Sequence, residues 1–314
     1  MTPSLIAITG PTASGKSEVA DLVAERLGSP VISADSMQVY RGMDIGTAKT
    51  PVAERRVPLL MVDLVDPVQP YSAALYQRDA REIIDGLLSR GMVPVLAGGT
   101  GLYLRAALDE MDFPRGEVGG HVRSRYEDVL ERRGGAALFE MLRERDPKSA
   151  DVIHPHNVRR VIRALEMCDE GVSYAEQKDG FSSPVAHYPY HLFALTMDRT
   201  ELYRRIDARV DRMIASGLVD EVRALVEHGA ADALTSRQAI GYKELIDALA
   251  GKITMGEAVD LIKRRSRRYA KRQLSWCRGD ARTEWLDIDE LGVAGAAQAI
   301  LDRGTFSLPD HEGC

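Results

Sequence analysis

The stretch that decides the fold reads Gly10-Pro11-Thr12-Ala13-Ser14-Gly15-Lys16-Ser17 and matches the phosphate-loop pattern G-x-x-x-x-G-K-[ST]. Before it, the apolar run Leu5–Thr9 predicts a buried strand; after it, Ser17–Leu27 has apolar residues at helical spacing. In this context backbone N–H groups and a helix N-terminus converge on phosphate oxygens. Lys16 supplies positive charge, and the Ser17 hydroxyl is placed to hold Mg²⁺. Alone, the loop would be interpreted as a nucleotide site that binds ATP.

The composition indicates a soluble globular protein. The chain has 314 residues, enough for two domains or for one domain with a large insertion. No apolar run approaches the ~20 residues that cross a bilayer, and we expect neither a membrane partner nor a signal peptide. The three cysteines are scattered without C-x-x-C pairing, which argues against zinc and disulfides and favours the cytoplasm. The net charge is −6, so nucleic-acid binding would require local basic patches.

Alternating strands and helices predict an α/β fold with a doubly wound, mostly parallel sheet. Besides the first strand, the apolar runs that predict strands are Val31–Ala34, Leu59–Asp63, Val93–Ala97 and Tyr190–Leu195. Helices are predicted at Ala73–Arg90, Val122–Arg133, Ala136–Arg145, His156–Glu170, Glu201–Val226, Thr235–Leu249 and Met255–Cys277. Because no strand is evident between them, we predict that residues 114–187 form a helical insertion. The catalytic core then comprises residues 1–113 and 188–290, with a peripheral segment at 291–314.

Asp35 follows the predicted strand Val31–Ala34 at its carboxyl end. Ligands of parallel α/β sheets bind outside this end of the strands, so Asp35 and the phosphate loop are expected to share one crevice. There Asp35 would hold Mg²⁺ or act as a general base. The structural alternative is a turn-forming Asp, supported by Ser36.

The predicted strand Val93–Ala97 is followed by Gly98-Gly99-Thr100-Gly101 and has no carboxylate at its end. NTPases with a phosphate loop usually place an acid there to support Mg²⁺ and the hydrolytic water. Small residues leave room for a flat substrate beside the backbone. The motif also resembles part of a dinucleotide fingerprint, but the third glycine is missing. We therefore predict a crevice that holds a diphosphate without hydrolysing a triphosphate.

Arg209 lies on or beside the apolar stripe of the predicted helix Glu201–Val226. A guanidinium rarely faces a core without an anion to meet it. Two kinds of anion remain open on the sequence. One is a phosphate ligand, which suits the fork geometry of the guanidinium, and the other is an internal carboxylate such as Asp35 or Asp63.

Two basic clusters are candidate RNA contacts. The first opens the predicted helix His156–Glu170 and contains Asn157, Arg159, Arg160 and Arg163. The second, in the last predicted helix, comprises Lys263, Arg264, Arg265, Arg267, Arg268, Lys271 and Arg272. No acidic residue interrupts this second run. A stripe of one sign on an acidic protein is typical of a phosphate-backbone contact, although a solvated face is the simpler alternative.

With these residues assembled, the chain resembles the bacterial tRNA dimethylallyltransferases, also called tRNA isopentenyltransferases, of the IPP transferase family. The resemblance extends over nearly the whole chain. It rests on the phosphate loop and on Asp35–Gln38, Tyr40–Lys49, Gly98–Tyr103, Asn157–Glu166, Arg209–Asp211, Arg237–Glu244 and Lys271–Leu274. Ser17 stands where many relatives have Thr, and either hydroxyl can bind Mg²⁺.

The resemblance implies transfer of a dimethylallyl group from dimethylallyl diphosphate to N6 of an adenine. That adenine lies directly 3′ of the anticodon in tRNAs that read codons beginning with U. The loop would hold the prenyl diphosphate rather than ATP. Lys16, Arg209 and Mg²⁺ on Ser17 would stabilise the departing diphosphate, Asp35 would take the proton from N6, and Thr100 would complete the catalytic group.

The same resemblance implies that the adenine leaves its stack to reach the donor and that the protein holds the tRNA anticodon arm. The contacts it implies are Asp35, Ser36, Met37, Gln38, Thr100, Arg123, Asn157, Val158, Arg159, Arg160, Val161, Arg237, Lys263, Arg267 and Lys271. We expect the protein to act as a monomer.

Three rival classes remain open on the sequence. A P-loop kinase acting on a nucleotide or another small metabolite shares the loop, the lysine and the Mg²⁺ hydroxyl, but it would need ATP. A prenyltransferase acting on free AMP or ADP would have no use for the basic stripe. An RNA-binding protein without enzymatic activity would not need Asp35 and Lys16 in one crevice.

Overall fold

The strand β1 (Leu5–Thr9) is completely buried and lies inside a parallel sheet. The other strands are β2 (Val31–Ser33), β3 (Leu59–Leu60), β4 (Val95–Ala97), β5 (Tyr190–Thr196) and β6 (Thr283–Asp287). Their order among the described residues is β3-β2-β4-β1-β5-β6, and every pairing is parallel. The predicted parallel α/β class is therefore confirmed. Neither β6 nor the shortness of β3 was predicted.

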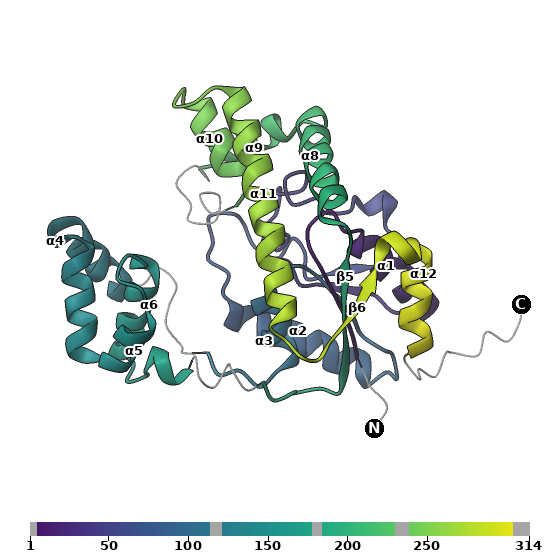
Figure 1. Cartoon of the computed structure of the whole chain (residues 1–314), viewed down its shortest axis with the longest axis horizontal. Coiled ribbons are helices and arrows are strands. Elements are labelled where there is room, and N and C mark those ends of the chain that lie inside the picture. The colour runs from purple at the N-terminus through teal and green to yellow at the C-terminus, as the bar shows by residue number, and fades with distance from the viewer. Residues whose placement is uncertain (1–4, 114–120, 178–183, 230–238, 304–314) are drawn as a thin grey trace, which may run out of the picture. The chain divides into compact units, whose positions relative to one another are not determined.

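The structure is a computed structural model of the chain, and it describes residues 5–113, 121–177, 184–229 and 239–303 (Figure 1). The chain divides into two compact units. The first comprises Met1–Tyr71, Leu75–Leu108 and Tyr188–Cys314, and the second comprises Ser72–Ala74 and Asp109–His187. No helix in the described ranges combines the length and the apolar character that a membrane crossing requires.

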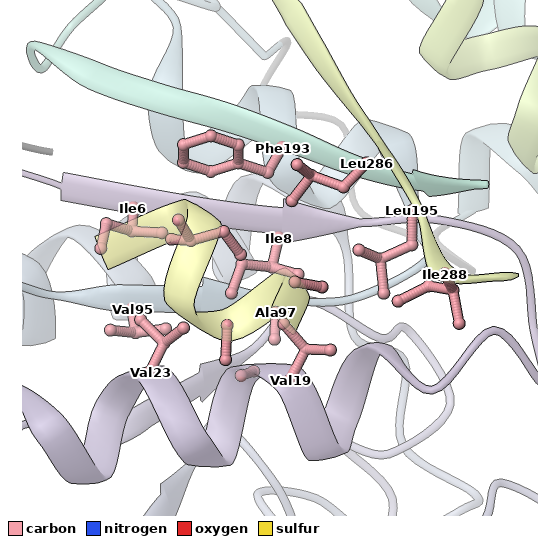
Figure 2. Packing of buried hydrophobic residues seen from close by; sticks show 14 of the residues in the cluster. Ile6, Ile8, Val19, Val23, Val95, Ala97, Phe193, Leu195, Leu286 and Ile288 are labelled. Carbon is pink, nitrogen blue, oxygen red and sulfur yellow. The ribbon is translucent and has the colours of Figure 1, made fainter. Parts of the chain in front are cut away.

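Outside the second unit, helices occupy the segments between the strands and beyond them. They are α1 (Lys16–Arg26), α2 (Ala73–Leu88), α3 (Gly101–Leu108), α8 (Arg199–Ala215), α9 (Leu218–Glu227), α10 (Tyr242–Leu249), α11 (Met255–Arg278) and α12 (Ile288–Arg303), with a 3₁₀ turn at Val52–Glu54. Figure 2 shows how Val19 and Val23 of α1 pack toward Ile8 of β1. This packing fixes the end of α1 that follows the phosphate loop.

The C-terminal helix α12 corrects the prediction of a peripheral segment at 291–314. Its residues Ala296, Ala297 and Ile300 are buried in the same core as β1 and α1. The described part of the segment, up to Arg303, therefore completes the core beside α1 (Figure 1). The prediction failed because glycines and alanines weaken the apolar pattern of this helix, which is also kinked at Gly292.

The predicted helix Glu201–Val226 is two helices, α8 and α9. Gly217 separates them with a φ of +99°, a left-handed conformation that ends a helix and that glycine adopts without strain. Asp198 caps the start of α8 by accepting hydrogen bonds from the N–H groups of Thr200 and Glu201. The predicted helix Thr235–Leu249 corresponds to α10 in its described part, and residues 235–238 lie outside the described ranges.

The second unit is helical, with α4 (His121–Arg145), α5 (Pro147–Val152) and α6 (Val158–Asp169). Gly134, with a φ of +77°, divides α4 at the position where the sequence predicts two helices. The unit has its own core, in which Tyr126, Leu142 and Leu165 are fully buried. The Tyr126 hydroxyl donates to the exposed Asp169 at 2.8 Å, so the polar end of this buried ring is hydrogen-bonded at the edge of the core.

Candidate active site

The phosphate loop lies between β1 and α1 and contains three residues with positive φ. Gly10 and Gly15 have φ values of +144° and +89°, and Ala13 has a φ of +66°. A Cβ on Gly10 would lie 3.1 Å from the carbonyl oxygen of Leu195, so a side chain there would crowd strand β5. The two glycines therefore allow the backbone to turn sharply from the strand into the helix.

The loop contains polar groups that have no hydrogen-bond partner within the described protein. In the described part of the chain, the backbone N–H groups of Gly15, Lys16 and Ser17 have no hydrogen-bond acceptor. The Ser14 hydroxyl is buried and also has no partner there. Buried donors without acceptors are unfavourable, and an anion at a helix N-terminus satisfies them. The geometry of the loop thus fits a bound diphosphate.

Lys16 is held beside this loop, with its ammonium 3.5 Å from the carbonyl oxygen of Pro11. Burial, and after it the charge of Arg209, lowers the pKa of Lys16 from 10.5 to about 8, while the Asp35 carboxylate opposes the shift. At neutral pH the side chain is still mostly protonated. It therefore presents a poorly solvated positive charge, which a phosphate would stabilise.

Asp35 lies two residues beyond β2, at the carboxyl end of the sheet. Its Oδ1 accepts a hydrogen bond from the N–H of Met37 at 2.9 Å. The side chain also lines a cavity of about 310 Å³, together with Ser36 and Met37. The prediction that Asp35 lies at a turn and the prediction that it faces a ligand crevice are therefore compatible: one oxygen fixes the turn, and the residue still faces the cavity.

Arg209 of α8 lines the same cavity. Burial lowers the pKa of its guanidinium, and Asp35 opposes that shift. Of the two proposed internal partners, Asp63 is ion-paired with Lys49 at 2.6 Å, and Asp35 makes no salt bridge with Arg209 in the described structure. Arg209 has no salt bridge in the described structure, although the nearby Asp35 carboxylate favours its charged form, so the guanidinium can still bind a ligand.

The cavity has a polar end and an apolar wall. Asp35, Arg209 and Arg272 are its charged members. Its apolar lining residues, contributed by α8, α9, α11 and the segment before α10, include Ile206, Val210, Met213, Leu218, Ile240 and Ile262. A ligand with an anionic group and a short hydrocarbon group matches this division.

Thr100 and the neighbouring glycines build the floor of this region. The N–H of Ser36 donates to the Thr100 hydroxyl at 3.0 Å, and that hydroxyl donates to Ser36 Oγ at 3.3 Å. A Cβ at Gly98 would lie 2.1 Å from the carbonyl oxygen of Ala34, and a Cβ at Gly101 would lie 2.2 Å from the ring of Trp276. The expected room for a flat substrate is thus filled by protein, and these glycines serve close packing of the chain on itself.

Gln38 and the segment after it are tied to each other. The Gln38 amide accepts from the Ser33 hydroxyl at 2.8 Å and donates to the Thr47 carbonyl oxygen at 3.3 Å. Further on, Lys49 is buried and ion-paired with Asp44 as well as with Asp63. These contacts give Gln38 a structural role; a contact with tRNA stays a prediction.

Glu221 of α9 is a residue near the cavity that was not predicted from the sequence. Its carboxylate accepts hydrogen bonds from the N–H groups of Asp44, Ile45 and Gly46 at 2.7–3.1 Å and from the Tyr242 hydroxyl at 2.6 Å. Gly46 is required there, because a Cβ would lie 2.5 Å from the Tyr242 ring. Glu221 therefore fixes the loop that forms one edge of the cavity. Only the Gly46 and Tyr242 positions, inside family-like motifs, pointed to this contact.

Three basic residues of α11 are ion-paired within the protein. Lys263 pairs with Asp211 at 2.6 Å, Arg267 pairs with Asp207, and Arg265 pairs with Glu244. The first two pairs link α11 to α8. A contact of Lys263 and Arg267 with tRNA stays a prediction. The exposed basic row consists of Arg264, Arg268, Lys271 and Arg272.

Thr254 and Glu257 form a capping box that fixes the start of α11.

In the helical unit, the predicted tRNA contacts differ in accessibility. Arg159 and Arg160 are exposed at the first turn of α6, and Asn157 caps that helix by accepting from the Arg160 N–H. Val158 is partly buried and packs against the unit's core. Val161 is fully buried in that core, so its side chain packs inside the unit and its contact with tRNA stays a prediction. The remaining predicted residue there, Arg123, is ion-paired with Glu127 and with the buried Glu166, so it connects α4 with α6. Arg237 lies outside the described residues.

Ser17 is exposed at the start of α1, the position that the loop pattern assigns to a Mg²⁺ ligand. Among the described residues, no three His, Cys, Asp or Glu side chains are grouped so that they could hold a metal ion. One hydroxyl fits only an ion that is also bound by ligand phosphate oxygens, which is the usual situation of Mg²⁺.

The sequence model of the IPP transferase family matches residues 38–280, which is most of the chain. The chain belongs to the IPP transferase family. A model of the isopentenyl transferases also matches, at residues 3–57, and thus includes the phosphate loop. The family membership agrees with the resemblance inferred from the motifs.

Relatives with known names match over nearly their full length. The tRNA dimethylallyltransferase of Desulforudis audaxviator is 45% identical over 302 residues, covering 95% of this chain and 97% of that protein. The tRNA dimethylallyltransferase of Carboxydothermus hydrogenoformans is 45% identical over 305 residues, with coverages of 96% and 97%.

Solved structures of the family have the same fold. The tRNA delta(2)-isopentenylpyrophosphate transferase of Staphylococcus epidermidis superposes with a TM-score of 0.71 at 39% identity and covers 96% of this chain and 98% of that one. A eukaryotic dimethylallyltransferase acting on tRNA superposes with a TM-score of 0.78 at 27% identity, with coverages of 95% and 77%.

Proposed function

We propose that this chain transfers a dimethylallyl group from dimethylallyl diphosphate to N6 of the adenine 3′-adjacent to the anticodon, in tRNAs that read U-initial codons. Diphosphate is released. One observation carries the proposal: Asp35 and Arg209 line one cavity beside the phosphate loop, with no salt bridge between them. Arg209 can therefore bind a leaving anion while Asp35 stays free to act as a base. Alkylation of an amine requires both functions at once.

The leaving group is stabilised by the phosphate loop. As the allylic carbon becomes cationic, negative charge grows on the diphosphate, and the N–H groups of Gly15, Lys16 and Ser17, which have no acceptor among the described residues, would donate to it. The Lys16 ammonium and the Arg209 guanidinium add charge from two sides. The Ser17 hydroxyl would hold Mg²⁺ on the diphosphate, where the ion supplies Lewis-acid stabilisation.

Asp35 serves as the base for the adenine N6. An exocyclic amine is a weak nucleophile, and a carboxylate that accepts its proton as the new C–N bond forms makes the attack easier. Met37 N–H holds one carboxylate oxygen. The apolar wall of the cavity, including Val210, Met213 and Ile262, suits the dimethylallyl group and keeps water from the cationic carbon.

The RNA-binding role rests on charge. The exposed basic row of α11 and the exposed residues Arg159 and Arg160 of the helical unit would contact the phosphates of the anticodon arm. The adenine would then leave its stack to reach the cavity. With its low cysteine content, the protein would act in the cytoplasm, as a monomer.

The deciding experiment offers labelled dimethylallyl diphosphate together with unmodified tRNA, AMP or ATP. Label is expected on tRNA alone. Label on AMP and not on tRNA would identify a prenyltransferase of free nucleotides and overturn the proposal. Phosphoryl transfer from ATP without prenyl transfer would identify a kinase, and tRNA binding without any transfer would identify an RNA-binding protein.

A further inference from the structure

Gln273 of α11 connects the two loops that surround the diphosphate site. Its side-chain oxygen accepts a hydrogen bond from the Thr12 N–H in the phosphate loop at 2.8 Å. Its side-chain nitrogen donates to the carbonyl oxygen of Gly99 at 3.0 Å. The residue is only 6% exposed. An amide that both donates and accepts is satisfied there, which neither a carboxylate nor an apolar side chain would achieve.

The surrounding residues are built around this amide. A Cβ on Gly99 would lie 2.0 Å from the Gln273 side-chain nitrogen and 3.7 Å from Cε of Lys16, so the amide approaches the backbone beside the lysine. Tyr269, one turn earlier on α11, donates a second hydrogen bond to the Gly99 carbonyl oxygen at 3.4 Å. Gly99 is thus small in order to admit Gln273.

The same helix carries the exposed basic row. Arg264, Arg268 and Arg272 recur every four residues, so they occupy one side of α11, while Gln273 on another side reaches the phosphate loop. An α-helix is stiff over three turns, and a shift of the basic row therefore moves Gln273 as well. α11 therefore carries both the exposed basic row and the side chain that bonds to the phosphate loop.

We propose that Gln273 is a positioning residue, which orients the phosphate loop and Lys16 for the diphosphate. This inference rests on the proposed function. It requires that both hydrogen bonds of the amide, and not merely its volume, determine how well the loop binds dimethylallyl diphosphate.

Two variants distinguish the effect of the two hydrogen bonds from the effect of side-chain volume. Gln273→Met keeps the volume and loses both hydrogen bonds at every pH; its kcat/KM for dimethylallyl diphosphate should fall roughly 10- to 100-fold, mainly through KM. Gln273→Glu as a carboxylate loses the donor and adds a negative charge near the diphosphate. When protonated, it restores a donor and an acceptor. Its activity relative to the unaltered protein should therefore rise as the pH falls from 8 to 5.5.

The matched control is Gln298→Glu on the exposed face of α12, where the amide donates to Asp302. Its activity ratio should not change with pH. Direct tRNA binding should be the same in all four proteins, and melting curves at each pH check the folding. A ratio for Gln273→Glu that does not depend on pH, or a loss of tRNA affinity that matches the loss of kcat/KM, would overturn the inference. If the unaltered protein does not prenylate tRNA, the proposed function itself fails.

Discussion

The guanidinium of Arg209 and the carboxylate of Asp35 line one cavity, yet in the described structure they do not form a salt bridge. Opposite charges in a partly buried site usually pair, because pairing offsets the loss of solvation. Their separation indicates that each has a different partner in the working complex. For Arg209 we infer the leaving diphosphate, and for Asp35 the adenine N6.

Asp35→Asn should abolish the base and keep the turn, since an amide oxygen can still accept from Met37 N–H. We expect the rate of prenyl transfer in single-turnover experiments to fall about 10²- to 10⁴-fold, the usual contribution of a general base. The tRNA dissociation constant should stay within about threefold. Asp220→Asn, exposed on α9, is the control. If tRNA binding collapsed while bound complexes still reacted normally, Asp35 would be a recognition residue.

Arg209→Met should weaken the binding of inorganic diphosphate roughly 10- to 100-fold, because a charge-assisted hydrogen bond is lost. Isothermal titration calorimetry measures this directly. The control is Arg204→Met on the exposed side of α8, where the arginine is ion-paired with Glu201. An unchanged affinity for diphosphate together with a lower melting temperature would assign Arg209 a purely structural role.

The pKa of Lys16 predicts a pH dependence. Only the protonated ammonium attracts diphosphate, so in the free protein the affinity for dimethylallyl diphosphate should fall as the pH rises through about 8. Binding curves between pH 6.5 and 9.5 test this, and Lys16→Met should remove that transition. An affinity that declines identically in both proteins would show that another group is responsible.

The same shift has a consequence for stability. The folded pKa of about 8 lies below the unfolded value of 10.5, so the folded state binds fewer protons between these two pH values. Burial of Lys16 therefore destabilises the folded protein less as the pH rises through that window. Compared with Lys16→Met, the unaltered protein should gain unfolding free energy between pH 8 and 10.5.

The exposed row of α11 predicts the salt dependence of tRNA binding. The double variant Arg264→Glu, Arg268→Glu should weaken binding and reduce the slope of log K against log salt by roughly one unit per contact. The matched control is Arg78→Glu, Arg90→Glu, at exposed positions on α2 and in the turn just after it. Arg267→Gln should instead lower the melting temperature, since Arg267 pairs with Asp207. An unchanged slope in the first variant would make this row an ordinary solvated surface.

Much of the site could be predicted from the sequence, because the spacing of residues within one strand, turn or helix determines where they lie. The glycines of the phosphate loop set its backbone, and a strand end followed by Asp35 sets the crevice. Arg209 was also correctly singled out, since the spacing of Ile206, Arg209 and Met213 places it beside the apolar stripe. Each of these inferences depends on a single strand, turn or helix.

Partners from distant segments could not be predicted. Lys263 and Arg267 are ion-paired with Asp211 and Asp207, which belong to another helix. The glycines after β4 were expected to leave room for a flat substrate, and sequence spacing could not show that the Gln273 side chain lies against Gly99. Val161 belongs to a family-like motif, and only the packing of the helical unit shows that it is buried.

The most direct test of the central claim is to locate the transferred group. Unmodified tRNA that reads a U-initial codon is incubated with the protein and dimethylallyl diphosphate, then digested and sequenced by mass spectrometry. We predict one added dimethylallyl group, on N6 of the adenine directly 3′ of the anticodon, and none when that adenine is replaced by guanine. A prenyl group at another nucleotide, or on the substituted tRNA, would contradict the account.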